Sequence, residues 1–153
     1  MRVIAFDQAK VTGYAVYEGE DLVKYGILDC SQHKDIAKRN HGVVNLILST
    51  IKRYNGEVFA IEDIQYQGIL RSYKPLARLL GAIEVMMTEH NFAYVIVKPG
   101  EWRKACGIKG RKREEQKANA ITWVKEKFNK DVSEDEADAI CIGWYLVKRM
   151  EKK

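Results

Sequence analysis

Four acidic residues have the type and spacing to do chemistry. Asp7 ends the apolar run RVIAFD, and Glu62 ends the similar run EVFAIE. An ionised carboxylate at the edge of a core is costly unless positive charge compensates it, although a turn or a cap could explain either acid alone. Asp135 and Asp138 are three positions apart, which places both on one face of a helix. Acidic residues are common in the first turn of a helix, where they interact favourably with the helix dipole, but this explains poorly why Asp138 would point inward.

The helix face of the two aspartates continues through apolar positions, so we expect both to point toward a sheet. These positions are Ala139, Ile142, Tyr145 and Leu146. Four carboxylates that meet at one place repel one another unless cations lie between them. Two divalent ions would balance the charge, and two-metal sites hydrolyse phosphodiesters by activating a water and stabilising the leaving oxygen.

The types of ligand available in the sequence indicate which metal such a site would bind. The chain has 3 Cys and 3 His, widely spaced and without a C-x-x-C pair, so neither zinc nor a disulfide framework is indicated. Carboxylate oxygens suit Mg²⁺, with Mn²⁺ as a substitute. We therefore expect two Mg²⁺ ions on Asp7, Glu62, Asp135 and Asp138.

These acids need elements that bring them together. Apolar runs predict strands at 2–7, 12–17, 21–28, 57–62 and 92–97. Helical periodicity predicts helices at 34–54, 75–90, 101–106, 113–128 and 134–149, the last opened by a capping box of Ser133 and Glu136. The order predicts an α/β fold with a mixed five-stranded sheet, three antiparallel strands and then parallel ones, flanked by helices. If the first and fourth strands are parallel neighbours, Asp7 and Glu62 emerge at the edge where open sheets bind ligands.

Composition and charge narrow the class of protein. The chain has 153 residues, of which 46% are hydrophobic and 31% charged, so we expect one domain over residues 1–153. There is no apolar run of membrane-span length and no signal-peptide h-region, so we expect a cytoplasmic protein with no membrane partner. Residues 98–130 carry 11 basic and 4 acidic side chains. Such a block is typical of nucleic-acid binding, and a solvated surface helix is the competing explanation.

Candidate DNA contacts come from the basic block and from the polar stretch after Glu62. Tyr66 and Tyr73 lie in and just after this stretch and are candidates for base stacking, whereas Trp123 and Trp144 fit a core. The basic candidates are Arg71, Lys104, Lys109, Arg111, Lys112, Arg113 and Lys117. Residues 108–116 are nearly all polar and predict a flexible loop that leads into a helix.

An ordered set of motifs resembles the RuvC family of Holliday-junction resolvases, in the ribonuclease H-like (retroviral integrase) superfamily. The motifs are Ile4–Asp7, Val11–Val16, Ala60–Glu62 and Asp135–Ile140, spread over nearly the whole chain. The resemblance implies a homodimer that resolves four-way DNA junctions by paired, Mg²⁺- or Mn²⁺-dependent nicks, leaving 5′-phosphate and 3′-hydroxyl ends. It also implies that Asp7, Glu62, Asp135 and Asp138 bind metal and that the dimer forms largely through the helix near 75–90.

The sequence departs from the family pattern at three points. The family usually follows its first aspartate with Pro-Gly, whereas Gln8-Ala9-Lys10 stands here. The aromatic residue that the family often places after the glutamate is shifted to Tyr66. The family's lysines near the site do not align with residues 102–117, so several of the basic candidates there could take their place.

Three other functions compete with junction resolution. A ribonuclease H-like nuclease could instead cut RNA or an RNA–DNA hybrid, which four carboxylates cannot distinguish. A non-catalytic DNA-binding dimer would need none of the acids. An ATP-binding protein of the actin and sugar-kinase group is disfavoured by the short chain and by the lack of a Gly-rich phosphate loop. Among DNA substrates, three-way junctions, flaps and forks are candidates beside four-way junctions.

Overall fold

The computed structural model describes residues 1–152. Its strands are β1 (Arg2–Asp7), β2 (Val11–Glu18), β3 (Asp21–Asp29), β4 (Val58–Glu62) and β5 (Ala93–Val97). Its helices are α1 (Ile36–Tyr54), α2 (Leu70–Glu89), α3 (Pro99–Cys106), α4 (Arg113–Phe128) and α5 (Glu134–Glu151). The strands form one sheet of order β3-β2-β1-β4-β5, in which β1 to β3 are antiparallel and β1, β4 and β5 are parallel. The predicted mixed sheet is confirmed.

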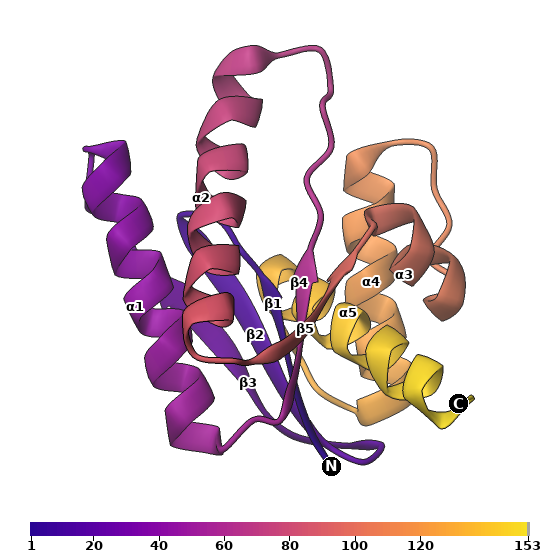
Figure 1. The fold of residues 1–153 in the computed structure, drawn as a ribbon. Helices are drawn as coiled ribbons and strands as arrows, with labels where there is room; N and C mark the ends of the chain where they lie inside the picture. Colours follow the sequence, from indigo (N-terminus) through magenta and orange to yellow (C-terminus); the bar gives the residue numbers. More distant parts are fainter. Residues whose placement is uncertain (153) are drawn as a thin grey trace.

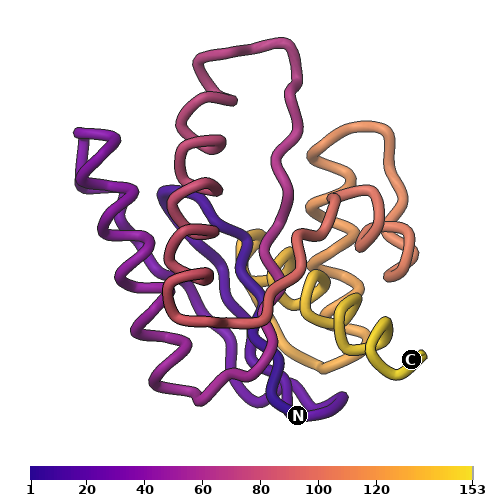
Figure 2. Tube along the Cα trace, in the orientation of Figure 1, coloured from indigo at the N-terminus to yellow at the C-terminus, as the bar shows by residue number. Residues whose placement is uncertain are grey.

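Helices cover both faces of this sheet. Helices α1 and α2 lie on one side and α3, α4 and α5 on the other (Figures 1 and 2). Alternate residues of β1 enter two separate cores: Ile4 and Phe6 pack with residues of α1 and α2, whereas Val3 and Ala5 pack with residues of α5. The same alternation holds in the parallel neighbour β4 and follows from the period of two in a strand.

This alternation decides where the strand-end acids point. Asp7 continues the odd-numbered face of β1, and Glu62 continues the face of β4 that carries Ala60. Both faces look toward α5. The parallel register pairs Phe6 with Ile61, so the next residue on each strand is an acid. Asp7 and Glu62 therefore leave the sheet side by side and on the same face.

Helix α5 packs very close to the strands because small residues line the contact. A Cβ added at Gly143 would lie 2.5 Å from a ring carbon of Tyr17, and one added at Gly13 would lie 2.6 Å from the carbonyl carbon of Asp135. Gly13 is also the register partner of Asp7. The Tyr17 hydroxyl donates a hydrogen bond of 2.6 Å to the carbonyl of Ile140. The start of α5 therefore sits directly against β2, at the residue that pairs with the end of β1.

Three helix starts differ from the prediction, and α3 is one of them, since it begins at Pro99 rather than at residue 101. Helix α2 begins at Leu70 rather than at residue 75, and Pro75 lies inside it. Because proline has no amide hydrogen, the helix loses only the hydrogen bond that residue 75 would donate to the carbonyl of Arg71. Arg71 lies in the first turn and is exposed. Helix α1 begins at Ile36 rather than at 34, because Asp35 caps it by accepting a hydrogen bond of 2.9 Å from the amide of Ala37. Within residues 1–152, none of the helices has the length and apolarity needed to cross a membrane.

Candidate active site

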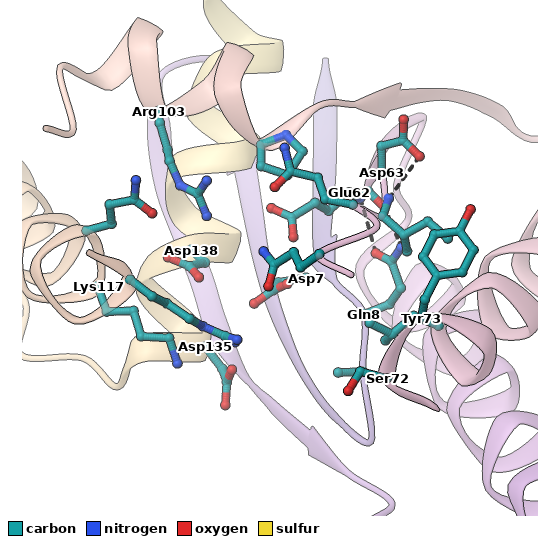
Figure 3. Close-up of a pocket in the computed structure, with 18 of the residues that line it drawn as sticks. Asp7, Gln8, Glu62, Asp63, Ser72, Tyr73, Arg103, Lys117, Asp135 and Asp138 are labelled. Atoms are coloured by element: carbon teal, nitrogen blue, oxygen red, sulfur yellow. Dashed lines mark hydrogen bonds between the residues drawn. The ribbon is translucent and has the colours of Figure 1, made fainter. Parts of the chain in front are cut away.

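A cavity of about 640 Å³ opens at the carboxyl ends of β1 and β4. Its walls come from the segment after β4, the start of α2, helix α3, the loop before α4 and the start of α5. All four predicted acids line it, namely Asp7, Glu62, Asp135 and Asp138. Figure 3 shows these carboxylates directed into the space between the sheet and the helices α3 to α5. The structure thus brings together residues that lie 131 positions apart in the chain.

The two aspartates of α5 owe their place to the start of that helix. Ser133 accepts a hydrogen bond of 3.3 Å from the amide of Glu136, and the Glu136 carboxylate accepts one of 3.0 Å from the amide of Ser133. This is the predicted capping box. It fixes where the helix begins, and therefore which residues of its first turns face the sheet. Asp135 and Asp138 lie half-buried on that side.

The shared environment raises the pKa of each of the four predicted acids. Burial raises the pKa of Asp7 well above its usual range, and the charges of the other three acids raise it further. Burial likewise raises the pKa of Glu62 to about 7 and that of Asp138 to about 6. The pKa of Asp135 is raised by burial and held down in part by Lys117. A cluster with such pKa values favours protons or metal ions as counter-charges.

Basic side chains face the acids across the cavity. Arg103 on α3 and Lys117 on α4 both line it, together with Arg111 and Arg113 from the start of α4 and the loop before it. The Nε atom of Arg103 is buried and has no hydrogen-bond partner among residues 1–152. Arg103 also lies over the Trp102 ring, 5.1 Å from its centroid, and its charge lowers the pKa of both Glu62 and Asp138. Lys117 is 2.8 Å from a carboxylate oxygen of Glu134.

The predicted DNA contacts divide into two groups. Arg111, Arg113 and Lys117 line the cavity. Tyr66, Arg71, Lys104, Lys109 and Lys112 lie on the exposed surface outside its lining. Tyr66 is 59% exposed and its ring packs edge-on against Tyr73, with centroids 5.5 Å apart. Tyr73 itself lines the cavity.

Sequence reasoning missed three residues that touch or face the acids. The indole of Trp102 donates a hydrogen bond of 2.7 Å to Oε2 of Glu62, and the side chain of Gln8 bonds the backbone of the same residue. Arg103 is one base among many in its segment, and nothing in its spacing sets it apart. The sequence offers one signal for Gln8, its place directly after Asp7, where the family has proline.

The donor chemistry of the cavity fits a hard divalent ion. Its acids offer only carboxylate oxygens, which Mg²⁺ prefers, and Mg²⁺ keeps several waters rather than demanding a full protein cage. Among residues 1–152, no three acidic, His or Cys side chains are already gathered tightly enough to close on one ion. Metal binding at this cavity would therefore include water ligands or draw the acids together.

This arrangement defines a class of protein. A mixed sheet of order β3-β2-β1-β4-β5, with acids at the ends of two parallel strands and on a helix packed beside them, is a ribonuclease H-like nuclease fold. Comparison with known proteins then identifies the family. Residues 7–144 match the family described as "Crossover junction endodeoxyribonuclease RuvC". The chain belongs to this RuvC family, whose members are metal-dependent nucleases, and it is a junction-resolving endonuclease.

Individual relatives agree over almost the full length. The crossover junction endodeoxyribonuclease RuvC of Dictyoglomus turgidum is 25% identical, over 97% of this chain and 98% of its own. The structure of Thermus thermophilus RuvC in complex with a Holliday junction substrate matches with a TM-score of 0.78 and 17% identity, covering 98% of this chain and 96% of that one. The Fowlpox virus resolvase, solved with Holliday junction DNA, matches with a TM-score of 0.66 and 16% identity, covering 98% and 99%. These two structures establish the likeness of fold.

Proposed function

We propose that the chain resolves four-way DNA junctions by paired nicks, using Mg²⁺ held by Asp7, Glu62, Asp135 and Asp138. The observation that carries the proposal is the convergence of these four carboxylates, all with raised pKa values, on one cavity flanked by basic side chains. The solved proteins that are similar to this chain include two with Holliday junction DNA.

Each part of the cavity has a task in phosphodiester hydrolysis. The four acids would hold the divalent ions, which would supply an activated water and stabilisation of the leaving 3′ oxygen. Arg103 and Lys117 face the acids and neutralise charge that develops on the scissile phosphate. Arg111 and Arg113 stand at the rim, where they contact phosphates on either side of the cleavage point. Recognition then depends on the shape of the junction more than on base edges.

A symmetric homodimer would account for paired, symmetric nicks. A four-way junction has two strands to cut, and a two-fold dimer presents two cavities related in the same way. We propose that one nuclease domain, residues 1–153, forms each half of this dimer through the exposed side of α2. Val85 on that helix is 58% exposed, and Leu70 at its start is 55% exposed, as expected of an apolar surface that a second copy would cover.

The test is cleavage of a labelled four-way junction beside its linear duplex and a matching RNA–DNA hybrid. Each substrate is incubated with Mg²⁺, with Mn²⁺, with EDTA, and with the Glu62→Gln protein in Mg²⁺. We expect metal-dependent, symmetric nicks in the junction and none with Glu62→Gln. Cutting of the hybrid alone would identify an RNA-processing nuclease instead, and binding without cutting in either metal would refute a catalytic role for the acids.

A further inference from the structure

Both the backbone and the carboxylate of Glu62 form hydrogen bonds with residues that are not acids. Nε2 of Gln8 donates a hydrogen bond of 2.5 Å to the backbone carbonyl of Glu62, and the amide of Glu62 donates one of 3.1 Å to Oε1 of Gln8. The indole nitrogen of Trp102 donates a third, of 2.7 Å, to Oε2 of the Glu62 carboxylate. Figure 3 shows Gln8 beside Glu62 with the backbone contact dashed.

The Gln8 contact takes over where strand pairing ends. The parallel pairing of β1 with β4 runs to Phe6 and Ile61 and then stops. Beyond that point, the amide side chain of Gln8 satisfies both the donor and the acceptor of the Glu62 backbone, as a neighbouring strand would. Gln8 is 6% exposed, so both of its polar atoms need partners inside the protein, and one residue supplies them. A proline at this place in the backbone has no amide side chain to do so.

The Trp102 contact fixes the carboxylate itself. Trp102 is 1% exposed and belongs to the core packed on α5, so its ring cannot shift without disturbing that packing. An indole N–H can only donate. Its bond to Oε2 therefore selects one orientation of the Glu62 side chain, at a residue that lines the cavity. Gln8 precedes Glu62 by 54 residues in the sequence, and Trp102 follows it by 40.

We propose that Gln8 and Trp102 are positioning residues that preset Glu62 for metal binding: Gln8 fixes its backbone and Trp102 its carboxylate. The proposal rests on the function proposed above, in which Glu62 is a metal ligand. Residues that orient a metal ligand typically contribute about 10- to 100-fold to metal affinity or activity. Removing either hydrogen-bonding group should therefore raise the Mg²⁺ concentration at half-maximal cleavage, while the affinity for junction DNA stays the same.

The first experiment compares Trp102→Phe and Gln8→Met with Trp123→Phe. Phenylalanine keeps an aromatic ring without the donor, and methionine keeps the length of glutamine without its amide. Trp123 lies in a separate aromatic group with Phe128 and Trp144, so it controls for the removal of an indole. We expect the half-saturating Mg²⁺ concentration to rise about tenfold in the first two variants and to stay unchanged in the control. Values within twofold of wild type in both folded variants would overturn the proposal.

The second experiment follows the wild-type protein itself and uses variants only for assignment and as a control. In ¹⁵N-tryptophan-labelled wild-type protein, the three indole N–H resonances are followed by NMR as Mg²⁺ is added without DNA. We expect the resonance of Trp102, assigned from its absence in Trp102→Phe, to shift more than the other two, and to stop responding in Glu62→Gln. A Trp102 resonance that ignores Mg²⁺ while Glu62→Gln abolishes cleavage would refute the positioning role alone. Full cleavage by Glu62→Gln would instead refute the proposed function.

Discussion

Replacement of Gly13 by alanine should separate cleavage from binding. Gly13 lies beside Asp7 in the sheet and against the backbone of Asp135 at the start of α5. The new Cβ would overlap the carbonyl oxygen of Asp135 and lie 2.6 Å from its carbonyl carbon, whereas ordinary contacts begin at 3.4 Å. The obstacle is backbone rather than a flexible side chain, so the start of α5 must retreat from the sheet. The retreat carries Asp135 and Asp138 away from Asp7 and Glu62.

The size of this displacement sets the size of the effect. Relief of the overlap requires a shift of at least about 1 Å, and a misplacement of that size in catalytic groups costs about 100-fold in rate. Overpacking of this kind also destabilises a protein by about 1–3 kcal/mol, which lowers the Tm of a chain this long by about 2–12 °C. The variant should therefore still be folded at 25 °C but cut slowly.

The assay is single-turnover cleavage of a labelled junction in saturating Mg²⁺, with binding measured separately in Ca²⁺. Gly100→Ala is the matched control, because a Cβ at Gly100 meets nothing within 4 Å. We expect a decrease of about 100-fold in rate for Gly13→Ala, with junction affinity within twofold of wild type. If Gly13→Ala cuts as fast as Gly100→Ala while its circular dichroism is native, the close approach of α5 does not position the site.

Three further outcomes follow from the site and its supports. Because Glu62 has a pKa of about 7 when folded, against an ordinary value of 4.5, the native state binds its proton more tightly. The stability of metal-free protein should therefore fall as pH rises from about 4.5 to 7, and Glu62→Gln should be more stable than wild type in EDTA at pH 8, by about 1–3 kcal/mol in urea titrations. Reversal of charge at Arg111, Lys112 and Arg113 should weaken junction binding and flatten its dependence on salt, by about 0.9 in log–log slope for each phosphate that the loop no longer neutralises; an unchanged slope would remove this loop from the DNA footprint. Ser133→Ala should remove the helix cap and about 1 kcal/mol of stability in the same urea titrations, with slower cleavage because the first turn of α5 frays; an unaltered midpoint would contradict this.

The sequence allowed the acids to be predicted because each of them is defined locally. Asp7 and Glu62 end apolar strands, and parallel neighbours end at one edge, so their meeting needed only the strand order. Asp135 and Asp138 share a helix face with apolar residues, so their direction followed from the helical period. These inferences use spacing within a single element, where a period of two or of 3.6 translates directly into direction.

The residues that position Glu62 could not be predicted in the same way. The bonds of Gln8 and Trp102 to Glu62 cross 54 and 40 residues of sequence, and no local pattern marks which polar side chain will meet which backbone group. The ring of Trp102 belongs to the core, yet its single polar atom bonds an acid of the cavity. The early start of α2 was missed because Pro75 suits a first turn, although a helix tolerates proline a little further in when few hydrogen bonds are given up.

The distribution of the acids along the chain has a consequence for biosynthesis. Asp7 and Glu62 belong to strands made early, whereas Asp135 and Asp138 belong to the last helix. A nascent chain on the ribosome therefore carries half of a nuclease until α5 has been translated and has docked. A truncated chain, or a proteolytic fragment without α5, would keep the basic residues of α3 and α4 but lack two of the four acids. If the four acids bind metal as proposed, a chain without α5 therefore cannot cut DNA.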